Sequence, residues 1–149
     1  MVVENIRIQE ITCAKSEYVA AVQVLLKQLT SSPVSFEIGD LEKLVKSDAS
    51  RLFFIFCEDE VAGMLTLVTY LTPTGPKTWV EDVVVDQRFR GRSLGRKLME
   101  FAIGEAAETA GNQLMLTSKP IRVAANALNR SVGFQSKQTN VYRMVFDEK

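Results

Sequence analysis

The chain has 149 residues, of which 46% are hydrophobic and 24% charged, and this composition is typical of a globular protein with one domain, which we expect to span residues 1–149. Eighteen basic and eighteen acidic residues cancel, so no overall positive field favours a nucleic acid or an anionic membrane as partner. The sequence contains no histidine, which removes the commonest metal ligand and general base, and we expect no metal site.

The N-terminus and the apolar stretches argue against export or membrane insertion. The first ten residues carry charge early and lack the apolar core of a signal peptide. The longest apolar stretches, such as residues 52–57, are too short to cross a bilayer. Two cysteines, Cys13 and Cys57, favour buried free thiols over a disulfide. These features predict a cytoplasmic protein.

The first elements in the chain are a strand and a helix. Residues 6–11 are apolar at every second or third position, which predicts a strand. Ser16 is suitably placed to cap a helix. The apolar residues of this helix share one face, and they are Tyr18, Val22, Leu25, Leu26 and Leu29.

A short helix and a hairpin follow. After a loop with serines and a proline, Asp40 is expected to cap a helix that carries Leu41, Leu44 and Val45. Residues 51–57 and 61–69 have strand patterns and are joined by an acidic turn, so we expect an antiparallel hairpin.

The second half of the chain also contains strand patterns and helix patterns in turn. A turn at residues 73–76 leads to a strand over 78–85. A helix is expected from Leu94 to a glycine cap at Gly111, with Met99, Ala102, Ile103, Ala106 and Ala110 on one face. A strand at 113–117, a helix from Pro120 to about Arg130, and strands at 133–134 and 140–146 complete the pattern. The order predicts an α/β (α+β) fold, a mixed sheet with helices on its faces.

Residues 79–98 are the most informative segment. The strand residues Val83, Val84 and Val85 run into a loop with Gly91 and Gly95, and a helix pattern opens at once. Glycines allow a ligand to approach the backbone, and a helix start offers unpaired N–H groups and positive potential. The loop is also basic and contains no acid between Arg88, Arg90, Arg92, Arg96 and Lys97. This combination predicts a pyrophosphate-binding loop.

This segment and the order of elements resemble the GNAT superfamily of acyl-CoA-dependent N-acyltransferases. The family signature is Gln or Arg, two residues, Gly, one residue, then Gly or Ala, and it falls here on Arg90, Ser93 and Gly95, with Ser93 at the first glycine. A second block, residues 116–120 followed by Arg122, Ala125, Asn126 and the pair Gly133-Phe134, resembles the family's fifth strand and following helix. The resemblance covers the whole chain. It implies a GNAT-like fold, with a mostly antiparallel sheet of six to seven strands flanked by about four helices, and acetyl-CoA as acyl-donor cosubstrate.

The resemblance also implies which residues hold the cofactor. Main-chain groups of the valine strand would pair with the pantetheine arm, and N–H groups of the basic loop would hold the pyrophosphate. Asn126 matches a position that contacts the cofactor, and Asn129 stands where the family usually has a tyrosine acid. The implied cofactor-binding residues are Val83, Val84, Val85, Arg90, Gly91, Arg92, Ser93, Leu94, Gly95, Arg96, Asn126 and Asn129.

The implied reaction is direct attack of a primary amine, from a small molecule or a peptide, on acetyl-CoA in a ternary complex. Glu81 is the candidate catalytic base and Asp82 its rival, and strand alternation places them on opposite faces unless a bulge intervenes. A backbone N–H near Val83 would meet the oxyanion. Because Asn129 cannot act as an acid, water, Ser131 or Tyr142 would have to protonate the thiolate.

Other interpretations stay open. The valine run fits any central strand, and the basic loop could be a solvated surface. A non-catalytic acyl-CoA-binding module is the alternative function, whereas a nucleotide hydrolase is excluded because no Gly-x-x-x-x-Gly-Lys-Ser/Thr run exists. The acidic pair suggests a cationic acceptor, and an amino sugar is possible because the Glu-Asp-Val-Val-Val strand resembles that of glucosamine-phosphate acetyltransferases. Homodimers are frequent among such proteins.

Overall fold

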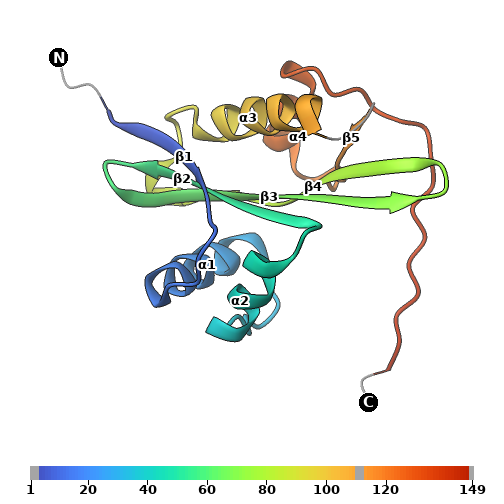
Figure 1. The fold of residues 1–149 in the computed structure, drawn as a ribbon. Coiled ribbons are helices and arrows are strands. Elements are labelled where there is room, and N and C mark those ends of the chain that lie inside the picture. Colours follow the sequence, from blue (N-terminus) through green and yellow to red (C-terminus); the bar gives the residue numbers. More distant parts are fainter. Residues whose placement is uncertain (1–3, 110–112, 148–149) are drawn as a thin grey trace.

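The computed structural model describes residues 4–109 and 113–147. A five-stranded sheet in the order β1-β2-β3-β4-β5 carries α1 and α2 on one face and α3 and α4 on the other (Figure 1). The elements are β1 (Ile6–Glu10), α1 (Ser16–Leu29), α2 (Ile38–Lys46), β2 (Ser50–Cys57), β3 (Glu60–Thr72), β4 (Gly75–Val85), a 3₁₀ turn (Gln87–Phe89), α3 (Leu94–Thr109), β5 (Leu114–Met115) and α4 (Val123–Ser131).

The core lies in two layers, one on each side of the sheet. Strand β2 is buried on both faces, so its consecutive phenylalanines enter different layers. Phe53 packs with Leu65 and Leu98 on the α3 side, and Phe54 packs with Leu25 and Leu41 beneath α1 and α2. These two layers fix β3 and β4 in the middle of the molecule.

The predicted hairpin of β2 and β3 is confirmed. Its turn contains Glu58 and Asp59, both with positive φ (50° and 71°), which matches the twist of a tight hairpin. The caps are different from those expected. Lys15, not Ser16, precedes α1, and α2 begins after Glu37, whose N–H donates to Asp40 at 2.9 Å in a capping box. The expected helix end at Ala110 and Gly111 lies outside the described residues.

The sheet is mixed and mostly antiparallel, as expected, but it has fewer strands than expected. The described residues form five strands rather than six to seven, because residues 133–134 and 140–146 lie in no strand. The expectation of closing strands was therefore wrong: the local pattern is present, but no neighbouring strand pairs with it. Within the described residues, no helix has the length and apolarity that crossing a membrane requires.

Strand β5 pairs only briefly with β4. The parallel ladder consists of Thr78 opposite Leu114 and Trp79 opposite Met115. Beyond these pairs β4 continues to Val85 without β5 beside it. The two strands therefore part in the middle of the molecule, next to α4.

Candidate active site

A cavity of about 500 Å³ lies where β4 and β5 part. Leu29, at the end of α1, forms one wall and Met99 of α3 another. The stretch after β5 contributes Thr117, Ser118, Lys119 and Arg122. Arg122 crosses toward α1, and its Nη2 donates to the carbonyl oxygen of Leu29 at 3.2 Å. The cavity thus connects the two faces of the sheet.

A bulge in β4 brings both acidic candidates to this cavity. Thr66 pairs with Glu81 and Met64 pairs with Val84, so one residue of β3, Leu65, faces two residues of β4. Asp82 has a φ of +49°, which is unusual for a residue with a side chain. Because of this extra residue, Glu81 and Asp82 line the same cavity instead of pointing to opposite faces.

The two carboxylates influence each other. Partial burial raises the pKa of Glu81, and the nearby charge of Asp82 raises this pKa further. A carboxylate with a raised pKa is a stronger base at neutral pH than an ordinary one. Glu81 is therefore better suited to accept a proton than a typical surface glutamate.

The loop before α3 has the backbone shape of an anion-binding turn. Gly91 has a φ of +82° and Ser93 a φ of +62°, so Ser93 adopts the conformation that a glycine would favour. The carbonyl oxygen of Ser93 accepts the first helical hydrogen bond, from the Lys97 N–H at 3.1 Å. The N–H groups of the first helical turn, Leu94, Gly95 and Arg96, are left without helical acceptors.

Three of the five basic side chains of this loop form ion pairs with acidic residues. Arg88 bonds to Asp86 (3.0 Å), Arg92 to Glu4 (2.8 Å) and Arg96 to Glu100 (2.9 Å). Among the described residues, Arg90 and Lys97 form no ion pair. The positive charge that remains for a ligand is thus concentrated on these two exposed residues.

Asp86 anchors the start of the loop. Its carboxylate is buried and accepts hydrogen bonds from the Arg88 backbone N–H (3.0 Å) and from the Arg88 Nε and Nη2 atoms (3.2 and 3.0 Å). Burial alone would raise its pKa, but the hydrogen bonds from Arg88 and Gln28 and the charge of Arg88 together outweigh burial, and the pKa of Asp86 lies below its usual range.

The loop and the cavity meet at Leu128 of α4. A Cβ placed on Gly95 would lie 3.4 Å from Leu128 Cδ2 and 3.8 Å from Val85 Cγ2, which are ordinary contact distances, so the first turn of α3 packs beside α4 and β4. Leu128 also lines the cavity. Met99 is the α3 residue that lines the cavity, and Leu128 lies between the cavity and the first turn of that helix.

The other sequence-predicted residues are dispersed. Val83 and Asn129 line the cavity, whereas Val84 belongs to the core beneath α1 and Val85 packs toward α3. The amide of Asn126 donates to the carbonyl oxygens of Lys119 (2.9 Å) and Arg122 (2.8 Å), and so shapes the loop before α4.

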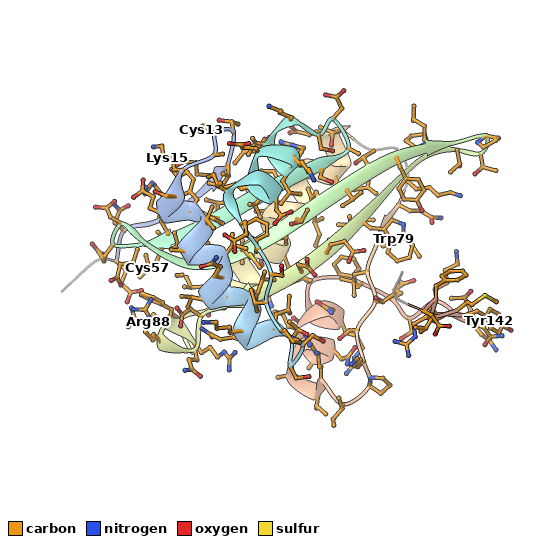
Figure 2. All side chains as sticks on the ribbon, turned by 90° about the horizontal axis from the view of Figure 1, so that it is seen from below. Cys13, Lys15, Cys57, Trp79, Arg88 and Tyr142 are labelled. Carbon is orange, nitrogen blue, oxygen red and sulfur yellow. The ribbon has the colours of Figure 1, made fainter. Side chains whose placement is uncertain are left out.

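Neither side chain proposed to replace the tyrosine acid lines the cavity. Ser131 accepts a hydrogen bond from Arg96 Nη1 at 3.0 Å and donates to the Leu128 carbonyl at 2.7 Å. Tyr142 is 87% exposed and lies far out on the C-terminal segment (Figure 2).

Several lining residues were missed by sequence reasoning. Lys119 and Arg122 belong to the second sequence block, so the resemblance of that block to the family could have indicated them. No local pattern indicates that Leu29 or Val141 lines the cavity. In the described part of the chain, no group of three or more potential ligands is placed to hold a metal ion.

Comparison with known proteins identifies the family of the chain. The sequence model of the Acetyltransferase (GNAT) family matches residues 21–134. A search of curated proteins by sequence found no significant match. The chain belongs to the GNAT acetyltransferase family.

Solved structures share the fold at low sequence identity. An aminoglycoside acetyltransferase from an uncultured soil metagenomic sample, in complex with sisomicin, is 15% identical with a TM-score of 0.78, covering 96% of this chain and 97% of that one. Glucosamine-6-phosphate N-acetyltransferase from Arabidopsis thaliana is 22% identical with a TM-score of 0.78 and coverage of 96% and 99%. The aminoglycoside N-acetyltransferase AAC(6')-Iy, in complex with CoA, is 15% identical with a TM-score of 0.79 and 97% coverage of each chain.

Proposed function

We propose that this protein is an acetyl-CoA-dependent N-acetyltransferase that transfers the acetyl group to a primary amine of a small molecule or peptide, by direct attack in a ternary complex. The observation that carries the proposal is the β4 bulge, because it brings the side chains of Glu81 and Asp82 to the same cavity, which Leu128 of α4 also lines. An acidic pair in the cavity and a helix start that packs near the lining residue Leu128 suit a cationic acceptor and a phosphate-bearing donor.

The residues present fit acetyl-CoA. Its pyrophosphate would lie against the N–H groups of Leu94, Gly95 and Arg96, where Gly91 and Ser93 already have the required positive φ. Arg90 and Lys97 would supply the charge. The pantetheine arm would enter between β4 and α4 past Leu128, and the thioester would supply the activated acyl group.

Glu81 removes the proton from the acceptor. An ammonium group cannot attack a carbonyl, so the amine must lose a proton to a nearby base, directly or through water. Asp82 contributes by raising the pKa of Glu81 and by attracting the cationic acceptor. A backbone N–H at the bulge, near Val83, meets the oxyanion, because a bulge takes residues out of the regular ladder.

The acceptor is a cationic amine with polar groups. Glu81 and Asp82 attract positive charge, whereas Lys119 and Arg122 on the opposite wall suit an anionic or hydroxyl-bearing part of the same molecule. Aminoglycosides and amino sugar phosphates both fit this distribution. Structures that share the fold include enzymes named for each of these classes.

Isothermal titration of acetyl-CoA tests the cofactor assignment. Gly91→Glu should weaken binding by more than about tenfold, because a carboxylate would stand in the phosphate turn. Gly75→Glu is the matched control: it also has a positive φ (111°) and open surroundings, but it lies in the β3–β4 turn. Equal affinity of folded Gly91→Glu and Gly75→Glu proteins would refute the phosphate site.

A non-catalytic acyl-CoA-binding module is the second candidate. Asn129 favours it, because this residue lines the cavity at the position of the family's tyrosine acid and cannot donate a proton as an acid. In the enzyme, water would have to protonate the departing thiolate. The two candidates differ in turnover but not in acetyl-CoA binding.

A further inference from the structure

The cavity has an apolar floor as well as polar walls. Its polar lining comes mainly from the β4 bulge and from the stretch after β5. Part of its apolar lining is continuous with the core on the α3 side of the sheet, and the residues of this part, here called the apolar floor, are Val80, Val83, Met99, Leu116 and Leu128. Acetyl transfer as proposed above gives no role to the side chains of Val80, Met99 and Leu116.

The apolar floor extends to the closed end of the gap between β4 and β5. The last pair of the ladder is Trp79 with Met115, so Val80 and Leu116 are the next residues, at the point where the strands part. Met99 lies in the second turn of α3, which runs back over β4 from the loop (Figure 1). Val80, Met99 and Leu116 therefore lie at the end of the cavity that is farthest along β4 from this loop.

An acyl donor bound as proposed directs its acyl chain toward this closed end. The pyrophosphate would lie at the start of α3, the pantetheine arm would pass Leu128, and the carbonyl would lie near Val83, so groups beyond the carbonyl continue toward Val80. Three residues of a strand span about 10 Å. The methyl carbon of an acetyl group lies only one bond, about 1.5 Å, beyond the carbonyl carbon. An acetyl group therefore leaves most of the apolar floor uncovered.

We propose that the enzyme also uses CoA thioesters of linear acyl groups longer than acetyl, such as propionyl and butyryl, and that Met99 limits the length of the chain. This inference rests on the proposed function and names the donor class of the same site. A hydrocarbon chain suits the apolar floor, because burial of apolar surface is favourable. A cationic acceptor would lose its hydration there without gaining a polar partner. Met99 is only 2% exposed and closes the floor on the α3 side.

The transfer step is the same for every chain length. The acceptor nitrogen forms a bond to the acyl carbon, the carbon–sulfur bond breaks, and CoA leaves as a thiolate. The ammonium loses one proton to Glu81, which passes it to solvent, and the nitrogen loses a second proton that reaches the thiolate through water. No further reactant is needed, so chain length acts only through contacts with the apolar floor.

Isothermal titration with acetyl-CoA, propionyl-CoA, butyryl-CoA and octanoyl-CoA, in the absence of an acceptor, tests the donor class. Each methylene buried on the floor should tighten binding about fourfold, so butyryl-CoA should bind about tenfold more tightly than acetyl-CoA. Octanoyl-CoA should gain nothing over butyryl-CoA, because its chain exceeds the floor. Binding of acetyl-CoA with no gain for propionyl-CoA or butyryl-CoA would overturn this proposal alone. Failure of all four thioesters to bind would overturn the proposed function as well.

Met99→Ala tests the length limit, and Leu98→Ala is its matched control. Both residues are buried in α3 and belong to the same core, but Leu98 does not line the cavity. Met99→Ala should raise the affinity for octanoyl-CoA relative to acetyl-CoA about fourfold or more, because the shorter side chain lets additional methylenes be buried. Leu98→Ala should keep the wild-type ratio. The same ratio in both folded variants would refute the role of Met99.

Leu116→Asn provides a second test that does not remove a fully buried side chain from the core. Leu116 is half-buried, and the substitution places an amide on the apolar floor at the closed end. A hydrocarbon chain cannot hydrogen-bond to this amide, so the preference for butyryl-CoA over acetyl-CoA should fall from about tenfold to about twofold or less. A preference that stays at the wild-type value would show that the acyl chain does not lie on the apolar floor.

Discussion

Asp82 combines a costly backbone conformation with a position in the cavity. Its φ of +49° costs a residue with a side chain about 1–2 kcal/mol, and such strained residues persist where the surrounding structure holds them in place. Here the strain accompanies the bulge that brings Glu81 and Asp82 to one cavity. We expect the pair to act together.

Asp82→Asn should move the acidic limb of the kcat/KM profile to lower pH. Burial raises the pKa of Glu81, and the charge of Asp82 raises it further, so removal of that charge lowers the pKa and keeps the base deprotonated in more acidic solution. The pH profiles of the wild type and the variant, measured with one acceptor, would show the shift. A limb that stays in place or moves upward would mean that Glu81 is not the titrating base.

Asp86 contributes to stability in a pH-dependent way. Its pKa in the folded protein is lowered, so its stabilising effect is fully present above the unfolded pKa of about 3.9 and is lost as the pH falls through the folded pKa. Asp86→Asn should reduce the free energy of unfolding at neutral pH by about 1–3 kcal/mol, because the bonds to Arg88 lose their charged acceptor.

Urea titrations of the wild type and Asp86→Asn at pH 7 and at about pH 3 would test this expectation. The difference between the two proteins should shrink at the lower pH. A difference that is constant or larger in acid would show that the carboxylate charge does not account for the effect.

At the scale of elements, β3 and β4 are held unusually close beside the bulge. A Cβ on Gly63 would lie 2.7 Å from the Val84 carbonyl oxygen and 3.1 Å from Ile55 Cγ2. The neighbouring backbone has no room to yield without moving a strand. The position of the bulge, and hence of the acidic pair, depends on this close approach.

Gly63→Ala should therefore destabilise the fold by about 1–3 kcal/mol through overpacking. Gly104→Ala is the matched control, because Gly104 lies within α3 with no atom near its missing Cβ, and a stabilisation of about 0.5–1 kcal/mol is expected there. Thermal or chemical unfolding of both variants gives the comparison. Equal effects of the two substitutions would show that the close strand approach has no energetic role.

At the scale of the whole molecule, local sequence patterns predict most helices and strands well, but they predict the contacts between these elements poorly. The acidic hairpin turn and the start of α3 depend on neighbouring residues and were predictable. The bulge was not, because strand alternation predicts opposite faces for Glu81 and Asp82. The Glu4–Arg92 pair joins residues 88 positions apart, and no local rule shows that Glu4 pairs with a basic side chain of the loop before α3.

The C-terminal segment is a second case in which the local pattern does not determine the contacts. The alternation of residues 140–146 predicts a strand that the structure does not contain, because a strand needs a neighbour to pair with. The described residues of one chain do not provide that neighbour.

Acetyl transfer is tested most directly by thiol release from acetyl-CoA, measured with a panel of aminoglycosides, amino sugar phosphates and amine-bearing peptides. We expect thiol release that depends on the acceptor, with a matching increase in the acceptor's mass. Glu81→Gln should lower the rate by about a hundredfold or more while leaving acetyl-CoA affinity unchanged. Binding of acetyl-CoA by the wild type, without thiol release above the uncatalysed rate for any amine, would contradict the enzyme and support an acyl-CoA-binding module.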